Sequence, residues 1–199
     1  MCRRMVILII ITISVGCNPR KGSATAPPGW RVPVSNLFIE VNAFPENWTV
    51  DFSTPKDKQD DTTINHVGRE WGGPESGRAW QSIWRAYSIS AAEELYKDLH
   101  VSQFIPKETL KPDTPFEKFS PPTEITFSSR MADEYYFACG VWRFPYWEAV
   151  ARYRNYVTNV HLPLKTADER NGGLTYDEME NVLRGMDQQF TEFFALINK

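Results

Sequence analysis

The sequence predicts an α+β fold, in which a mostly antiparallel sheet packs with a central helix and a long C-terminal amphipathic helix. Short segments of alternating apolar and polar residues, typical of strands, lie on both sides of one helical segment. Residues 175–197 carry apolar residues at helical spacing. The 199-residue chain is 42% hydrophobic, which excludes a disordered chain and provides for a core. Strands, an inserted helix, more strands and a closing helix are the order typical of α+β domains.

The first strands are predicted near the start of this domain. Residues 34–44 are apolar enough to be partly buried as a short helix or an extended segment, and a turn follows at 45–47. Strands are predicted at 48–52, where apolar and polar residues alternate, and at 64–71. A third strand, 79–88, is dense in aromatic and β-favouring residues. One face of this strand would carry Trp80, Ser82, Trp84 and Ala86.

A central helix is predicted after these strands. Ser90 and Glu93 have the spacing of a capping box at its start, and the helix should end near Val101. Residues 106–122 contain five prolines and predict a long surface loop, a candidate lid. A further short strand is predicted at 123–127.

Two long strands, 135–142 and 148–162, are predicted to form an antiparallel hairpin around residues 143–146. One face of the second strand carries Arg152 and Arg154. Because an arginine-bearing strand face is usually in water, we expect the opposite face, rich in alanine, tyrosine and valine, to pack on the core.

The C-terminal helix, 175–197, has the clearest pattern in the chain. Thr175 and Glu178 form a second capping-box pattern. Its apolar stripe consists of Met179, Val182, Leu183, Met186, Phe190, Phe193, Phe194 and Ile197. This helix should therefore cover one face of the sheet.

The N-terminus has the features of an export signal. Arg3 and Arg4 precede a ten-residue apolar run, 6–15, which is too short to span a bilayer but has the length of a signal-peptide core. Residues Ser14-Val15-Gly16-Cys17, at the end of this run, resemble the lipobox of bacterial lipoproteins, with Ser14 at the position where that family prefers leucine. The resemblance implies that the signal is cut before Cys17, that its thiol is diacylated, and that the new amine is often acylated with a further fatty acid such as palmitate.

This resemblance divides the chain into three parts. Residues 1–16 would be the signal peptide, 17–33 a lipidated flexible tether rich in proline, glycine and small polar residues, and 34–199 a single α+β domain. The implied location is extracytoplasmic, with the lipid as anchor to the cell membrane. The alternatives are an ordinary signal cut after Gly16 or Ala24, and an uncleaved N-terminal anchor.

The charge of the chain excludes one class of partner. Its net charge is -3, and removal of the signal would change it to -5. A sequence pI near 5.7 argues against nucleic acid, because phosphate binding needs a concentrated positive field. The mildly acidic surface would also not adhere to anionic lipid by itself, so the lipid anchor would hold the protein at the membrane.

No local motif predicts catalysis. The sequence contains no glycine-rich phosphate loop, no nucleophile elbow and no paired catalytic carboxylates. Cys139 is the one cysteine that remains after signal removal and acylation of Cys17, and a nucleophilic role would require His66, His100 or His161 nearby. Its place in the middle of a predicted strand favours a small buried residue instead. An enzyme with dispersed catalytic residues remains the alternative.

Metal ligation has one candidate segment. Residues 168–178 resemble part of an EF-hand loop, with Gly172 at the sharp turn and Glu169, Asn171 and Glu178 at ligand positions. The first ligand position would be an alanine, which cannot bind calcium. The alternative is a Gly-Gly turn leading into the capped C-terminal helix. No zinc-type spacing occurs, and the sequence predicts no cofactor.

Aromatic residues and arginines are concentrated between residues 135 and 156. Such side chains are enriched at protein interfaces, and flat aromatic rings also stack on sugars. The alternatives are insertion of the hairpin tip into the membrane interface and a core closed by bulky rings. The candidate interaction surface at the tip consists of Trp142, Arg143, Phe144, Tyr146 and Trp147.

These observations favour a lipid-anchored extracytoplasmic binding or interaction module of the bacterial cell envelope. Its partner would be an envelope protein, as for an assembly factor, or a small hydrophobic or sugar-like ligand. A cell-envelope hydrolase with dispersed catalytic residues is the alternative.

Overall fold

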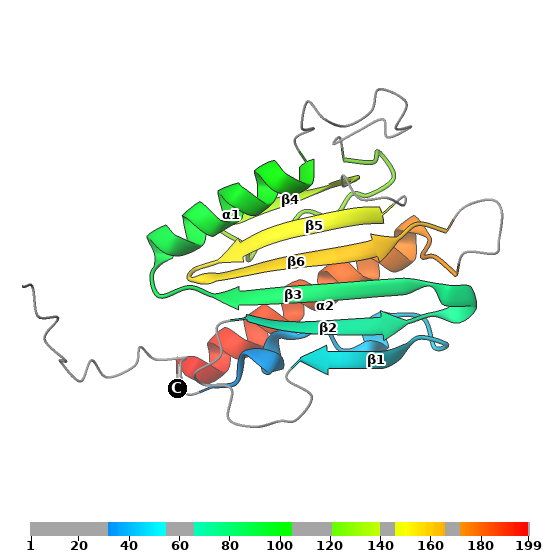
Figure 1. The fold of residues 1–199 in the computed structure, drawn as a ribbon, viewed down its shortest axis with the longest axis horizontal. Coiled ribbons are helices and arrows are strands. Elements are labelled where there is room, and N and C mark those ends of the chain that lie inside the picture. The colour runs from blue at the N-terminus through cyan, green and yellow to red at the C-terminus, as the bar shows by residue number, and fades with distance from the viewer. Residues whose placement is uncertain (1–31, 55–65, 105–120, 140–145, 166–171, 199) are drawn as a thin grey trace, which may run out of the picture.

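A sheet of six antiparallel strands forms the centre of the computed structural model, which describes residues 32–54, 66–104, 121–139, 146–165 and 172–198 (Figure 1). The strand order is β1-β2-β3-β6-β5-β4. The strands are β1 (Thr49–Thr54), β2 (His66–Gly72), β3 (Arg78–Arg85), β4 (Glu134–Cys139), β5 (Tyr146–Tyr153) and β6 (Tyr156–Pro163). The helices are α1 (Ile89–Phe104) and α2 (Tyr176–Ile197), with the 3-10 turns η1 (Val34–Leu37), η2 (Val41–Ala43) and η4 (Pro74–Ser76). The predicted α+β fold, with its central helix and long C-terminal helix, is confirmed.

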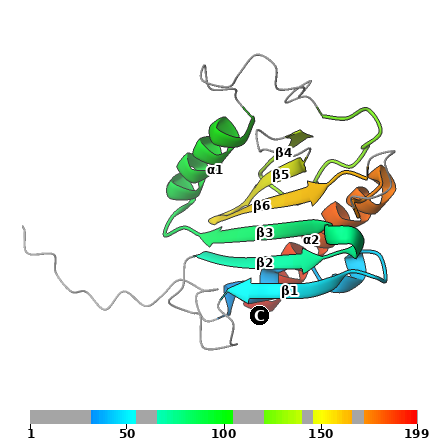
Figure 2. The same cartoon turned by 45° about the vertical axis from the view of Figure 1, so that its right-hand side comes forward.

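The two long helices lie on opposite faces of the sheet (Figures 1 and 2). Helix α2 packs with η1 and η2 on one face and closes the larger core. Helix α1 packs on the other face against β4, β5 and β6, where it forms a smaller core. Among the described helices, none lies over β1 and β2 on the α1 side (Figure 2). The α1 side of the sheet is therefore covered unevenly.

Helix α2 follows its predicted pattern closely. Its apolar stripe is buried from Met179 to Phe194, and the Tyr153 ring of β5 stacks on the Phe190 ring at 3.8 Å between centroids. The predicted capping box is confirmed, because the Thr175 N–H donates to the Glu178 carboxylate at 2.8 Å and the Glu178 N–H donates to the Thr175 hydroxyl at 3.3 Å.

The segment before β1 forms the short helical turns η1 and η2, and a short helix was one of its two predicted forms. This segment is also hydrogen-bonded to the sheet. The Ile39 N–H donates to the buried Gln81 side chain at 3.0 Å, and the Gln81 amide donates to Thr158 of β6 at 3.0 Å. Val32, which the sequence places in the tether, already packs against the larger core. The N-terminal segment is thus part of the folded unit.

The prediction of one long strand at 148–162 is wrong, because the chain turns back after Tyr153 to form the β5–β6 hairpin. Arg154 has a positive φ of 56°, which is uncommon for a residue other than glycine. Contacts from distant segments hold this turn: the Arg154 N–H donates to the Asp133 carboxylate at 2.6 Å, and the Asn155 amide donates to the Ala86 carbonyl at 3.0 Å.

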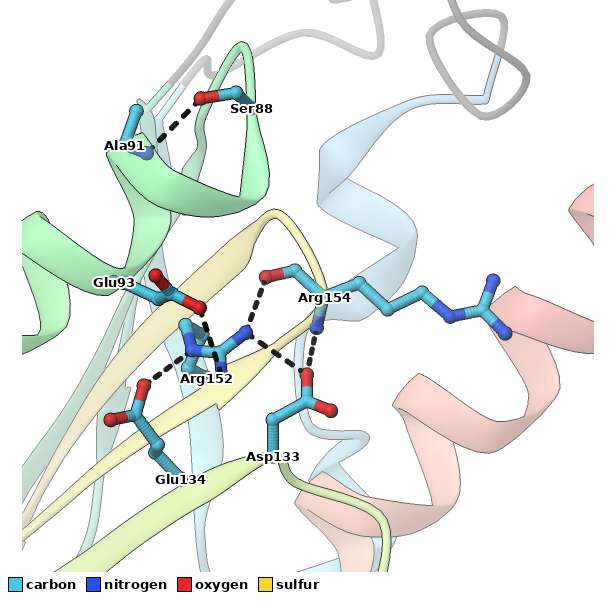
Figure 3. A network of polar contacts seen from close by, with 7 residues as sticks. All are labelled: Ser88, Ala91, Glu93, Asp133, Glu134, Arg152 and Arg154. Atoms are coloured by element: carbon cyan, nitrogen blue, oxygen red, sulfur yellow. Dashed lines mark hydrogen bonds and ion pairs between the residues drawn. The ribbon is translucent and has the colours of Figure 1, made fainter.

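The prediction that the arginine-bearing face of this strand lies in water is also wrong for Arg152, whose residue is only 7% exposed. Its guanidinium lies 2.5 Å from a Glu134 oxygen, 3.2 Å from Asp133 and 3.9 Å from Glu93 of α1 (Figure 3). A charged side chain is buried only when it is paired, and here three carboxylates from two segments pair it. Helix α1 covers the face that we expected to be in water.

Two smaller predictions are corrected. Helix α1 is capped by Ser88, whose hydroxyl accepts from the Ala91 N–H at 3.1 Å, and not by Ser90 (Figure 3). Residues 123–127 form no strand and instead bind through their backbone N–H groups to Glu180 of α2. The other strands match their predictions apart from small shifts at the ends. Residues 106–120 of the predicted loop lie outside the described residues.

Candidate functional site

The candidate site is a carboxylate–histidine pair in the central strands. Glu148 of β5 lies opposite His161 of β6, which in turn lies opposite Trp80 of β3. Residues directly opposite in an antiparallel ladder share a face, so all three belong to the α1 side. The Glu148 side chain is 0% exposed and the His161 side chain 4%. The His161 Nδ1 lies 2.7 Å from the Glu148 Oε1, which is the distance of an ion pair, although no hydrogen bond of normal angle joins the two.

A third polar side chain lies on the same face. Asn159 of β6 is 3% exposed and lies opposite Ser82 of β3 and Val150 of β5. Among the described residues, neither the Glu148 Oε2 nor the Asn159 Oδ1 has a hydrogen-bond partner. A buried polar atom without a partner costs about 1–3 kcal/mol. The site thus presents two buried acceptor oxygens that call for donors.

Aromatic rings frame this polar cluster toward the open half of the face. The half-buried Trp80 ring lies 4.3 Å from the His161 ring, tilted by 52°. Further along β3, Trp84 stacks on His66 at 4.7 Å with an angle of 11° between planes. Burial lowers the pKa of His66 from its ordinary value of 6.5, which favours the neutral imidazole in this stack. The cluster therefore combines a carboxylate, an amide and flat apolar rings, the mixture found in small-molecule sites.

The sequence pattern places Trp80, Ser82 and Trp84 on one face, which is confirmed, but it does not indicate the Glu148–His161 pair. Both residues were assigned to a single strand, at opposite ends. The available signal is the occurrence of glutamate, asparagine and histidine in a strand-like stretch rich in alanine, valine and tyrosine. Within one continuous strand, alternation would place Glu148 on the face opposite to Asn159 and His161. Only the turn after Tyr153 brings the three side chains onto one face.

The structure separates Cys139 from the histidines. Cys139 lies opposite Trp147, which lies opposite Leu162, so its side chain belongs to the α2 side, whereas His161 belongs to the α1 side. The thiol is half-buried. His100 packs instead against the Tyr136 ring at 4.6 Å. A cysteine–histidine nucleophile formed by Cys139 and His161 is therefore not possible in this fold.

The aromatic hairpin is described only in part. Trp142, Arg143 and Phe144 lie outside the described residues. Tyr146 and Trp147 are half-buried, and the Trp147 ring packs 5.7 Å from Phe137 on the α2 side. Other aromatic residues of this region, namely Phe137, Tyr153 and Tyr156, belong to the larger core.

The candidate calcium ligands are not brought together in the described part of the chain. Glu169 and Asn171 lie outside it, and Glu178 is engaged in the capping box of α2. Within the described residues, no group of three or more histidine, cysteine, aspartate or glutamate side chains is placed to hold a metal ion. Cys17, the candidate lipidation site, also lies outside the described residues.

Two open surface hollows of about 630 and 770 Å³ lie on the α2 side, away from the Glu148–His161 pair. The first is bordered by Glu40, Asn42, Phe44, Gln188 and Glu192. The second is bordered by Thr126, Ser128, Arg130, Arg184 and Asp187. Both are open to solvent, and none of the described residues that border them carries a buried side-chain polar atom without a partner.

No family model, curated protein or solved structure matches this chain. Within the described ranges, none of the helices is both long and apolar enough to cross a bilayer.

Proposed function

We propose that this protein is a lipid-anchored extracytoplasmic binding module of the bacterial cell envelope. In this proposal Cys17 carries the lipid, residues 18–31 hold the domain away from the membrane, and the domain binds a small organic ligand on the α1 side of the sheet. The support for the anchor is the lipobox resemblance at 14–17. A single acyl chain gives only marginal, reversible membrane binding, whereas two or more acyl chains give stable attachment.

The single observation that supports ligand binding is the buried Glu148, which retains an oxygen without a partner next to Asn159 and His161. A sheet of this kind needs no carboxylate at its centre, because apolar side chains of similar volume stabilise such a position as well or better. A buried acceptor without a partner in the protein requires a donor from outside the chain, which a ligand or an ordered water supplies.

Binding can be tested by native mass spectrometry of the full chain, purified in detergent after expression in a bacterium with its own signal peptide. We expect an adduct that is lost on denaturation of the wild-type protein and is absent from the Glu148→Gln variant. Glu192→Gln, an exposed position on α2, is the matched control and should keep the adduct. An adduct retained equally by all three proteins would contradict this location of the site.

The anchor can be tested by growth with an alkyne-bearing palmitate analogue. The wild-type protein should incorporate the label and remain with the membrane fraction, whereas Cys17→Ser should lose both properties. Label incorporation in Cys17→Ser would contradict acylation at this residue.

A second candidate, a cell-envelope hydrolase, is favoured by the same pair, because a carboxylate beside a histidine is the arrangement of a general base. It requires turnover of an ester or amide substrate that is lost in both His161→Gln and Glu148→Gln. Binding without turnover would favour the module. An envelope-protein partner is the remaining alternative, and it requires that Tyr146→Ala abolish a crosslink formed in intact cells without a change in melting temperature.

A further inference from the structure

The atoms that lack partners in the site share one chemical property, since all of them are acceptors. The Glu148 carboxylate and the Asn159 carbonyl oxygen contribute no donor. The two residues occupy diagonal positions across the β5–β6 ladder. Residues at such positions lie about 7–8 Å apart, which is within reach of long side chains. A single small group placed between them would have to donate to both.

The charge of the site restricts that group further. Glu148 is fully buried, and a buried carboxylate is stable only when a cation or several donors oppose it. His161 approaches Oε1 at 2.7 Å, and Oε2 has no hydrogen-bond partner among the described residues. Charge-assisted hydrogen bonds to a carboxylate are about twice as strong as neutral ones.

The rings beside the pair suit the same kind of group. Trp80 lies against His161 and is half-buried, so its ring borders both the polar cluster and the open half of the sheet face. The face of a tryptophan ring attracts organic cations, and this attraction increases when the site is desolvated.

We infer, building on the proposed binding function, that the ligand is a small organic molecule with a protonated primary amine, which donates to Glu148 and Asn159 and lies near Trp80. A primary ammonium has three donors and no acceptor, which complements a site whose unmet atoms are all acceptors. A sugar hydroxyl supplies one donor together with acceptors, and no charge. A metal ion would require further ligands, and the described residues bring together no third acidic, histidine or cysteine side chain here.

The experiment measures tryptophan fluorescence of the full chain in detergent, titrated at neutral pH with n-butylammonium chloride, 1-butanol or glucose. We expect n-butylammonium to bind the wild-type protein, and both neutral probes to bind at least about tenfold more weakly, a difference of 1.4 kcal/mol. Glu148→Gln should weaken n-butylammonium binding at least about tenfold, and Glu192→Gln should not change it.

Trp80→Phe and Trp80→Leu keep the inference testable if Glu148→Gln does not fold. The phenylalanine variant retains a ring face and should bind n-butylammonium, whereas the leucine variant should bind it several-fold more weakly, read by calorimetry. Absence of n-butylammonium binding, or equal binding of the alcohol, overturns the inference. In that case the native mass spectrum separates the two proposals, since a neutral adduct lost in Glu148→Gln preserves the binding function and no adduct removes it.

Discussion

Replacement of Glu180 by glutamine should destabilise the protein at neutral pH and remove part of its acid sensitivity. Glu180, on α2, fastens the irregular segment before β4 to the helix. Its Oε1 accepts from the Thr126 N–H at 2.5 Å, the Thr126 hydroxyl at 2.9 Å and the Phe127 N–H at 2.9 Å. Its Oε2 accepts from Arg184 at 2.9 Å. Glutamine keeps the shape of this side chain but loses its charge and one acceptor.

The size of the destabilisation expected for Glu180→Gln follows from the pKa of Glu180. Partial burial raises this pKa, but the hydrogen bonds from Thr126, Arg184 and Phe127 outweigh it and lower the pKa from 4.5 to about 2. Because the pKa is depressed in the folded protein, the stabilisation is complete above pH 4.5 and is lost as the pH falls toward 2. At 1.36 kcal/mol per unit of pKa, the shift corresponds to about 3 kcal/mol of stability. Solvent screening at the helix surface reduces this contribution to about 1–2 kcal/mol.

Urea unfolding at a series of pH values measures this contribution. The wild-type protein should be more stable than Glu180→Gln by about 1–2 kcal/mol at pH 7, and the difference should shrink as the pH falls below 4.5. Glu192→Gln, also on α2, should differ little from the wild type at any pH. A Glu180→Gln deficit of the same size at both ends of the series would refute the argument from the carboxylate charge.

Three further substitutions test the packing. Phe190→Ala removes a fully buried ring stacked on Tyr153 and should lower the unfolding free energy by about 3–5 kcal/mol in urea. Gly172→Ala should lower the unfolding free energy by at least about 1 kcal/mol by the same measurement, because Gly172 has a φ of +54° and an added Cβ would lie 1.6 Å from a backbone oxygen. Gly68→Ala is the control and should be nearly neutral, because its added Cβ would lie 3.8 Å from the nearest backbone oxygen. Arg152→Met removes a buried guanidinium that faces three partly exposed carboxylates, and it should lower the unfolding free energy at neutral pH by about 1–2 kcal/mol in urea.

The parts of the fold that the sequence predicts well are those fixed by local interactions. Helix α2 carries its capping box and its apolar stripe within one segment, so periodicity and capping suffice to find it. Strands β1, β2 and β3 are bounded by turn residues that are local in the same way. These elements need little from the rest of the chain to be recognised.

The β5–β6 turn depends instead on contacts that no local pattern contains. Arg154 and Asn155 are held by Asp133 and Ala86, which belong to other segments. Read as one extended strand, the chain would separate Glu148 from His161 by about 43 Å, at about 3.3 Å per residue. The missed turn therefore also concealed the candidate site, since the hairpin alone places the two side chains opposite each other.

The burial of Arg152 was missed for a related reason. A charged residue on a strand is expected in water, and only the position of α1, together with carboxylates at Asp133 and Glu134, makes its burial favourable. Sequence alternation identifies which residues share a face, but not which face a helix will cover.

The last prediction separates a structural role of the Glu148–His161 pair from a functional one. Replacement of a buried ion pair by apolar side chains of similar volume is often neutral or stabilising by about 1–4 kcal/mol, whereas removal of one partner is costly. The double variant Glu148→Met/His161→Phe should therefore melt at the same or a higher temperature than the wild type, and the single variant Glu148→Met should melt lower. If the pair exists for binding, the stable double variant should also lose the ligand adduct. A double variant that melts lower but retains the adduct would mean that the pair serves the sheet, and that the binding surface lies elsewhere on the protein.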